Sequence, residues 1–128
     1  MTTIKTNTDL EQSKKLAEIL PLESADMCYY EYTSHIDGTP KVGYKEGITE
    51  GIPCWSLAAL LSILPNNEHI TTSVSRGSWQ LETITYLPNT WWCVYEDSKS
   101  LTEFNLSADN PVDACVNMII KLNEQNLL

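Results

Sequence analysis

The sequence predicts an α+β fold: an antiparallel, meandering sheet of four to five strands with three helices packed mainly on one face. Two observations indicate this class. Apolar residues recur at helical spacing in three segments, and aromatic and β-branched residues gather in the segments between them. The expected order is α-β-(β)-α-β-β-(β)-α. At 128 residues the chain has the usual length of one domain, and we expect 1–128 to form a single core.

The first expected helix follows a loosely ordered, polar start at residues 1–7. Thr8 with Glu11 three positions later is the sequence pattern of a capping box, which begins a helix at Thr8. Apolar residues then repeat at helical spacing until Pro21, which cannot continue a helix.

The aromatic segment 27–33 favours a strand. Glycines and a proline punctuate residues 35–51, for which we expect a loop with one short exposed strand near Lys41–Lys45. This loop lacks the Gly-Lys-Ser/Thr ending of a phosphate-binding loop.

The second helix is expected after Ser56, a plausible N-cap, and it ends at Pro65. Leucines form its main stripe, and alanines and Ile63 occupy the other sides. A helix that is apolar all round is typically buried, so we expect this helix to lie in the core.

Strands are expected at 69–75, 78–86, 91–96 and 101–106. The segment 87–90 has the composition of a turn, which predicts an antiparallel hairpin between 78–86 and 91–96. Residues 91–95 are apolar on both faces, which indicates a central strand.

The last helix has the clearest boundary signals. Asn110 is the expected N-cap, Pro111 occupies the first helical position, and Asp113 complements the helix dipole. An apolar stripe from Val112 to Leu122 predicts the buried face.

Charge argues against two classes of partner. The formal net charge is −9, and Arg76 is the single arginine. Proteins that bind nucleic acid neutralise phosphates with Lys and Arg, and anionic membranes attract basic surfaces. We therefore expect neither nucleic acid nor a membrane as partner, whereas an acidic surface is compatible with a basic protein.

The four cysteines are Cys28, Cys54, Cys93 and Cys115, without paired spacing. Their apolar neighbours indicate buried thiols, and no signal peptide is visible, so we expect a reducing, cytoplasmic location. Two disulfides stay possible on spacing alone.

Two segments carry a resemblance. The stretch 52–65, a proline, a capping Ser, an apolar helix and a second proline, resembles a segment of short hypothetical proteins of gut bacteria and their prophages. The stretch 109–114, followed by an apolar helix, resembles the end of the same proteins. The resemblance implies a small accessory protein of phage or mobile-element type. That family has no assigned activity, so it supplies no site residues.

Candidates for chemistry are few. Cys54, just before a helix N-terminus, is the best candidate nucleophile, but a cysteine nucleophile needs a histidine nearby, and a buried inert thiol is favoured. Neither His35 nor His69 has metal-ligand spacing, so we expect no metal and no cofactor. Surface carboxylates such as Glu96, Asp97 and Glu103 would serve a hydrolase or ligand-binding domain, although solvated turn residues are the simpler reading.

Aromatic residues on the expected strands suggest an interaction surface. Neighbouring strand residues point to opposite faces, so one core cannot take every aromatic ring. Tyr and Trp are enriched at binding hot spots. We therefore expect Tyr30, Tyr32, Trp79 and Trp92 to mark an uncovered sheet face for a protein partner or for self-association as a homodimer; the opposing possibility is that both faces are covered. The function expected is a non-enzymatic accessory or interaction domain, with a small cysteine- or carboxylate-dependent hydrolase or ligand-binding domain as the alternative.

Overall fold

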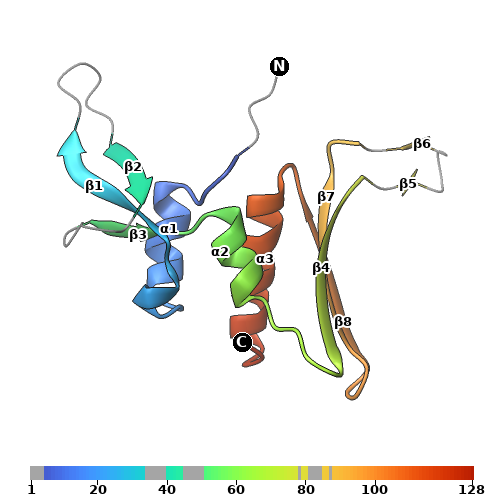
Figure 1. Ribbon diagram of the computed structural model, residues 1–128. Helices are drawn as coiled ribbons and strands as arrows, with labels where there is room; N and C mark the ends of the chain where they lie inside the picture. The colour runs from blue at the N-terminus through green and yellow to red at the C-terminus, as the bar shows by residue number, and fades with distance from the viewer. Residues whose placement is uncertain (1–4, 34–39, 45–50, 78, 81–84, 87) are drawn as a thin grey trace. The chain divides into compact units, whose positions relative to one another are not determined.

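The computed structural model describes residues 5–33, 40–44, 51–77, 79–80, 85–86 and 88–128, and for 30–33, 40–44, 79–80 and 85–86 it describes the backbone alone (Figure 1). The chain divides into two compact units. The N-terminal unit is Thr6–Ile63, and the C-terminal unit is Leu64–Leu128 with Met1–Lys5. Each is described by itself below.

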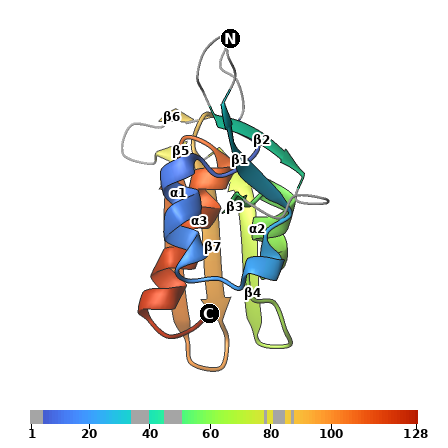
Figure 2. The same cartoon turned by 90° about the vertical axis from the view of Figure 1, so that its left-hand side faces the viewer.

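The N-terminal unit begins with α1 (Leu10–Ala17) and a 3₁₀ turn, η1 (Leu22–Ser24). Three strands form its sheet in the order β2-β1-β3, with all pairs antiparallel: β1 (Met27–Thr33), β2 (Pro40–Tyr44) and β3 (Ile52–Cys54). The unit closes with α2 (Leu57–Ile63). Within this unit α1 contacts β3. The helix α1, in blue, and the strands β1 and β2 can be followed in Figure 2.

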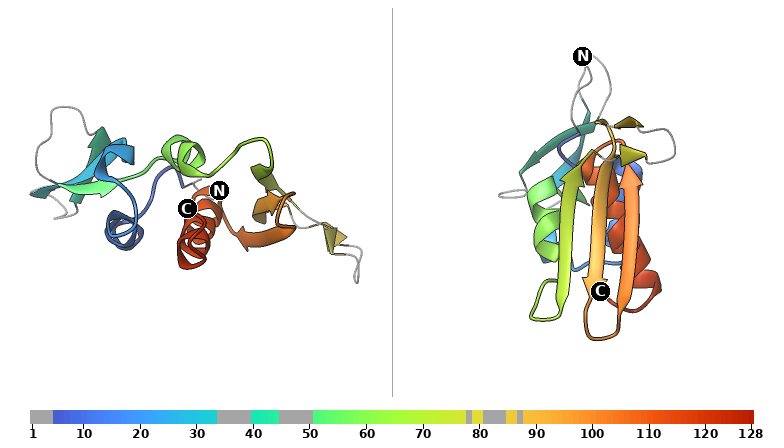
Figure 3. Two further views of the ribbon diagram at one scale, coloured as in Figure 1. Left: turned by 90° about the horizontal axis from the view of Figure 1, so that it is seen from below. Right: turned by 90° about the vertical axis from the view of Figure 1, so that its right-hand side faces the viewer.

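The C-terminal unit is a sheet backed by one helix. Its strands β4 (Ile70–Arg76), β7 (Trp91–Asp97) and β8 (Thr102–Ala108) pair antiparallel in the order β4-β7-β8. The helix α3 (Pro111–Glu124) contacts all three strands. The right-hand view of Figure 3 shows the strands side by side with α3 behind them. A separate two-stranded sheet pairs β5 (Trp79–Gln80) with β6 (Thr85–Tyr86).

The strand register of the C-terminal unit gives the sheet two distinct faces. Residues directly opposite one another point to the same face. The rows Thr72–Tyr95–Phe104 and Val74–Cys93–Leu106 therefore face α3, and each of their side chains is buried or half-buried. Three other rows form the open face: Thr71–Glu96–Glu103, Ser73–Val94–Asn105 and Ser75–Trp92–Ser107. Every residue that β4 and β8 contribute to these rows is exposed.

The structure confirms the mixed α+β class but not the single meander of four to five strands, because the described strands divide among three sheets. The helices likewise do not share one sheet face: α1 contacts β3, whereas α3 contacts β4, β7 and β8. The expected hairpin between 78–86 and 91–96 is wrong. β5 and β6 pair with each other, and β7 pairs with β4 and β8, which leaves β7 central as its two-sided apolar pattern predicted.

Two helix predictions also need correction. α1 is capped by Asp9 and Gln12, not by Thr8 and Glu11: Gln12 N–H donates to Asp9 Oδ1 at 2.8 Å, and Asp9 N–H donates to Gln12 Oε1 at 3.0 Å. α2 is not buried all round. Leu60 is fully buried, but Ala58 and Ser62 are exposed and Leu61 is 43% exposed, because α2 buries one side only.

Other predictions are confirmed. Ser56 caps α2 through a 3.2 Å hydrogen bond from Ala59 N–H to its hydroxyl oxygen, and Asn110 caps α3 through a 2.8 Å bond from Asp113 N–H. Lys5 forms a 2.8 Å ion pair with Asp113 in the first turn of α3. No helix among the described residues combines the length and apolar character that crossing a bilayer requires.

Candidate functional site

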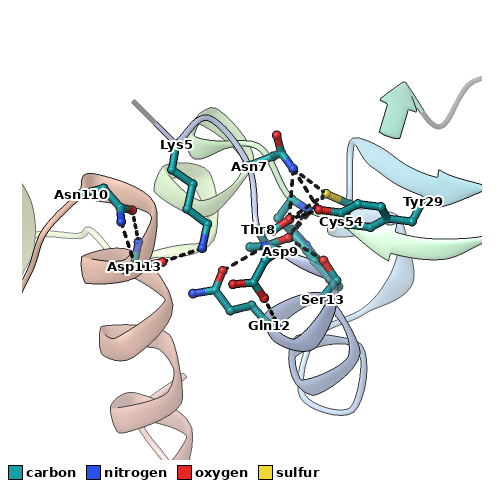
Figure 4. A network of polar contacts seen from close by, with 11 residues as sticks. Lys5, Asn7, Thr8, Asp9, Gln12, Ser13, Tyr29, Cys54, Asn110 and Asp113 are labelled. Carbon is teal, nitrogen blue, oxygen red and sulfur yellow. Dashed lines mark hydrogen bonds and ion pairs between the residues drawn. The ribbon is translucent and has the colours of Figure 1, made fainter. Parts of the chain in front are cut away.

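Cys54, the weak catalytic candidate, lies at the end of β3 in a buried polar network (Figure 4). Its thiol donates to the Thr8 carbonyl oxygen at 3.4 Å, and Asn7 Nδ2 approaches the sulfur at 3.5 Å. The Tyr29 hydroxyl donates to the same carbonyl oxygen at 2.8 Å. The sulfur is fully buried. A buried thiol that donates its hydrogen bond to a backbone carbonyl is a structural group rather than an exposed nucleophile.

The network around Cys54 holds the start of the chain against β3. Thr8 N–H donates to the Trp55 carbonyl at 2.9 Å, and Trp55 N–H donates to the Thr8 hydroxyl at 3.1 Å. Ser13 of α1 completes it, with its hydroxyl 2.8 Å from that of Thr8. Within the described part of this unit no histidine accompanies Cys54; His35 lies outside the described residues.

The four aromatic candidates do not share one sheet. Tyr30 and Tyr32 belong to β1, Trp79 to β5 and Trp92 to β7. The side chains of the first three lie outside the described part of the structure. Trp92 does lie on the open face of the β4-β7-β8 sheet, between Ser75 and Ser107, and it is half-buried.

The open face is mostly polar. Apart from Trp92, its residues are Ser, Thr, Asn, Glu and Val94. The aromatic rings of Tyr95 and Phe104 instead stack on the face toward α3, with a distance of 5.7 Å between the ring centroids. Two buried polar atoms of β7 lack a hydrogen-bond partner among the described residues, Trp92 Nε1 and the Tyr95 hydroxyl. Burial, with the Asp97 carboxylate, raises the pKa of Tyr95.

The turn joining β7 to β8 borders an acidic hollow. The hollow has a volume of about 280 Å³, and its lining includes Glu68, His69, Glu96, Asp97, Leu101 and Glu103. The loops before β4 and after β7 are tied together here, because Ser98 N–H donates to the His69 carbonyl oxygen at 2.8 Å. The described residues include no cluster of three or more side chains arranged to hold a metal ion. We call this acidic hollow with Leu101 at its rim the hairpin end.

Leu101 is the unusual residue of the hairpin end. It is 87% exposed, the largest exposed fraction among the exposed large apolar residues that the structure describes. Its φ of 60° lies in the left-handed region, which costs a residue with a Cβ about 1 kcal/mol. The other described non-glycine residue with positive φ is Asn126, a residue type that tolerates this conformation.

Electrostatics at the hairpin end is also locally unfavourable. Glu96 and Glu103 stand directly opposite one another on the open face, and both are exposed. Like charges in this cross-strand position destabilise a sheet. Partial relief comes from Asn105 Nδ2, which donates to Glu103 Oε1 at 3.2 Å.

Asp97 organises the turn. Its Oδ1 accepts the backbone N–H groups of Lys99 at 2.9 Å and Ser100 at 3.2 Å. Partial burial acts to raise the pKa of Asp97, but these N–H groups, the Ser100 hydroxyl and the nearby His69 outweigh it, so the pKa lies below its usual value. Asp97 is therefore a firmly ionised member of the hairpin end.

Sequence reasoning named Glu96, Asp97 and Glu103 as carboxylates around one turn, and the structure brings them together there. Leu101 was missed because the sequence places it in a strand, and leucine is not a turn residue. The chain matches no protein-family model, no curated protein and no solved structure. Function is therefore inferred from the residues of the sites themselves, and the resemblance to short prophage proteins stays a prediction.

Proposed function

We propose that this protein is a non-enzymatic accessory domain that binds another protein, and that the hairpin end is its binding surface. The observation that carries the proposal is Leu101, a large apolar side chain held almost fully in water on strained backbone. Strained backbone and an exposed large apolar side chain both weaken a fold. Natural proteins keep such features mainly at functional sites, so they indicate a functional position.

The charges around Leu101 define the partner. Glu68, Glu96, Asp97 and Glu103 lie around the hollow, with His69 among them and Lys99 exposed in the same turn. An apolar anchor surrounded by carboxylates is complementary to an apolar pocket rimmed by Lys or Arg. The net charge of −9 favours the same kind of partner over long range. We therefore infer a basic protein partner, in keeping with the accessory role that the resemblance to prophage proteins implies.

The hairpin end is a different surface from the aromatic sheet face expected from the sequence. On the open face of the C-terminal sheet the described aromatic side chain is Trp92, and it is half-buried among small polar residues. Exposed Ser, Thr and Asn side chains offer little of the buried apolar area on which binding hot spots depend. Leu101 offers such area at the end of the same sheet.

The test compares four forms of the whole chain as bait: wild type, Leu101→Asn, Glu103→Lys and Ser107→Lys. Ser107 is exposed on the same strand and the same face as Glu103, two rows away, so it controls for added positive charge. Lysate of the cells that encode the protein is passed over each bait, and the affinity of the captured partner is then measured by titration.

We expect one basic protein that wild type and Ser107→Lys bind equally. Leu101→Asn should weaken the binding about 10-fold to 100-fold, the usual effect of removing a hot-spot side chain. Glu103→Lys should weaken it about 10-fold, and added salt should reduce that difference. Equal binding by all four baits, or capture of nothing beyond what an unrelated acidic domain captures, would overturn the proposal.

A further inference from the structure

The two outer strands of the C-terminal sheet end the sheet in different ways. In the right-hand view of Figure 3, β4 and β8 are the outer strands and β7 lies between them. The loop that precedes β4 closes the edge of that strand. Ile70 N–H donates to Asn67 Oδ1, and Asn67 N–H donates to the Ile70 carbonyl oxygen, both at 2.9 Å. Thr72 N–H donates to Asn66 Oδ1 at 2.9 Å.

These hydrogen bonds also show which backbone groups of β8 point away from the sheet. In an antiparallel ladder, successive residues of a strand bond to opposite sides. Because Ile70 bonds outward, its neighbour Thr71 bonds to Glu96 of β7. Tyr95, the neighbour of Glu96, then bonds to Phe104 of β8. The outward-pointing N–H and C=O groups of β8 therefore belong to the alternate residues Glu103, Asn105 and Ser107.

The edge of β8 is open along the whole strand. Among the described residues, no side chain or loop backbone forms a hydrogen bond with these outward groups. The strand is seven residues long and pairs with β7 without a bulge. It contains neither proline nor lysine, with which natural proteins protect exposed edges, and its one charged residue is Glu103. An open edge of this kind is a template for another strand.

We propose that β8 is a homodimer interface, at which β8 of a second copy of this chain pairs with it antiparallel across a two-fold axis. When the axis passes through the middle of the strand, Asn105 stands opposite itself and every residue of β8 has a partner. The outward groups of the two copies then form about six backbone hydrogen bonds. This interface is independent of the proposed partner binding, because Leu101 lies outside the paired segment.

The side chains of β8 are complementary to themselves in this register. On the open face, Glu103 stands opposite Ser107 of the second copy, which keeps the two Glu103 carboxylates apart, whereas a register centred on Glu103 would place them opposite each other. On the face toward α3, Phe104 stands opposite Leu106 of the second copy. Both are half-buried in one copy, and pairing removes more of their apolar surface from water. A second copy of the chain therefore fits this edge.

A change of charge at Ser107 tests the register. In the dimer this exposed residue faces Glu103 of the second copy, so Ser107→Lys makes two opposite-charge pairs and Ser107→Glu makes two like-charge pairs. Ser75→Lys is the matched control. Ser75 is exposed in the same row of the open face but lies on β4, so the variant changes the net charge equally, away from the interface. Sedimentation equilibrium over a series of protein concentrations measures the Kd of each dimer.

A change at Asn105 tests the backbone pairing. Asn105→Pro removes an outward N–H beside the two-fold axis, and the monomer should still fold because this N–H does not bond to β7. Asn105→Thr keeps the N–H and is the matched control, and circular dichroism monitors folding in both variants. In wild type, the amide protons of Asn105 and Ser107 should exchange with solvent more slowly as the protein concentration rises, which NMR measures directly.

Salt and bait density separate this interface from the hairpin end. Each copy carries a formal net charge of −9, so added salt should screen the repulsion and strengthen the dimer, whereas it should weaken the binding of a basic partner. Bait that is immobilised at low density stays monomeric. In the partner assay, Ser107→Lys therefore acts on single copies and still controls for added charge.

We expect wild type to dimerise with a Kd of about 1–100 μM, as small interfaces do. Ser107→Lys should tighten the dimer about 10-fold, and Ser107→Glu and Asn105→Pro should each weaken it about 10-fold or more. Ser75→Lys and Asn105→Thr should stay within about 3-fold of wild type. If Asn105→Pro does not fold, the Ser107 variants and the wild-type amide exchange decide. A monomer at every concentration up to about 1 mM, or a dimer whose Kd Ser107→Glu leaves unchanged, would refute the proposal.

Discussion

Asp26 and Ser56 are joined by two hydrogen bonds, which link the start of β1 to the start of α2. Ser56 N–H donates to Asp26 Oδ1 at 2.9 Å, and the Ser56 hydroxyl donates to Asp26 Oδ2. The same hydroxyl oxygen accepts Ala59 N–H and so caps the helix. One serine thus satisfies a helix terminus while a carboxylate 30 residues earlier in the chain holds its position.

Replacing Ser56 by Ala should lower the free energy of unfolding by about 1–2 kcal/mol, because the cap is lost and one oxygen of Asp26 loses its partner. Ser62→Ala is the matched control in the same helix. The Ser62 hydroxyl donates to the Ala59 carbonyl, a bond that a helix does not need, so its removal should change stability by less than about 0.5 kcal/mol. Urea unfolding followed by circular dichroism measures both; equal losses would contradict the capping role.

Thr8 provides a second prediction, through its buried hydroxyl. Thr8→Val keeps the shape of the side chain but leaves Trp55 N–H without its acceptor, which should cost about 2–3 kcal/mol. Thr8→Ser keeps the hydroxyl and loses one methyl group, so about 1 kcal/mol is expected. If Val proved the milder replacement in urea unfolding, the hydrogen bond to Trp55 would not be what stabilises the start of the N-terminal unit.

Thr8 also shows why some local predictions fail. The sequence holds two overlapping capping patterns, Thr8 with Glu11 and Asp9 with Gln12, and local propensity favours neither strongly. A distant residue decides between them. Because the Thr8 hydroxyl accepts the hydrogen bond from Trp55 N–H, the helix is capped by Asp9 and Gln12. No pattern along the chain reveals that partner.

The strands likewise show the difference between local signals, which the sequence reveals, and distant partners, which it does not. The position of β7 at the centre of its sheet was predictable, because a strand with apolar residues on both faces needs neighbours on both sides. Its pairing with β4 was not, since the turn signal at 87–90 favoured the nearer segment. The start of α3 was predicted correctly, because its two signals, the N-cap Asn110 and Pro111 at the first helical position, involve only neighbouring residues.

Asp97 should titrate below the ordinary carboxyl pKa in the folded protein. A carboxyl whose pKa is lowered by folding stabilises the fold fully above its unfolded pKa of about 3.8, and this contribution is lost as pH falls through the folded value. Ser100→Ala should move the pKa upward, whereas Ser98→Ala, whose hydroxyl donates to the His69 carbonyl, should leave it unchanged. NMR titration of the Asp97 side chain measures the midpoint; a value at or above 3.8 in wild type would contradict the hydrogen bonding described.

Leu101→Asn should raise the free energy of unfolding by up to about 1 kcal/mol, because asparagine tolerates left-handed backbone and an 87% exposed leucine contributes little burial. Leu101→Ala is the matched control: it removes the same apolar group but keeps a Cβ in the strained conformation, so no gain is expected. Denaturant unfolding of the three proteins measures the difference. A loss of stability in Leu101→Asn would mean that Leu101 packs in the fold and is not an anchor for a partner.

Glu103→Lys should stabilise the folded protein while it weakens partner binding, and the opposite signs distinguish a functional charge from a structural one. The change replaces the like-charge pair with Glu96 by an opposite-charge pair in the same cross-strand position, worth about 0.2–1 kcal/mol. Glu103→Gln should give a smaller gain, since it only removes the repulsion. Thermal unfolding at low and high salt measures both variants, and the gain should shrink at high salt because exposed charges are screened. If Glu103→Lys instead lowers the stability, the hydrogen bond from Asn105 outweighs the repulsion between Glu96 and Glu103. The like charges would then not be a loss of stability that partner binding explains.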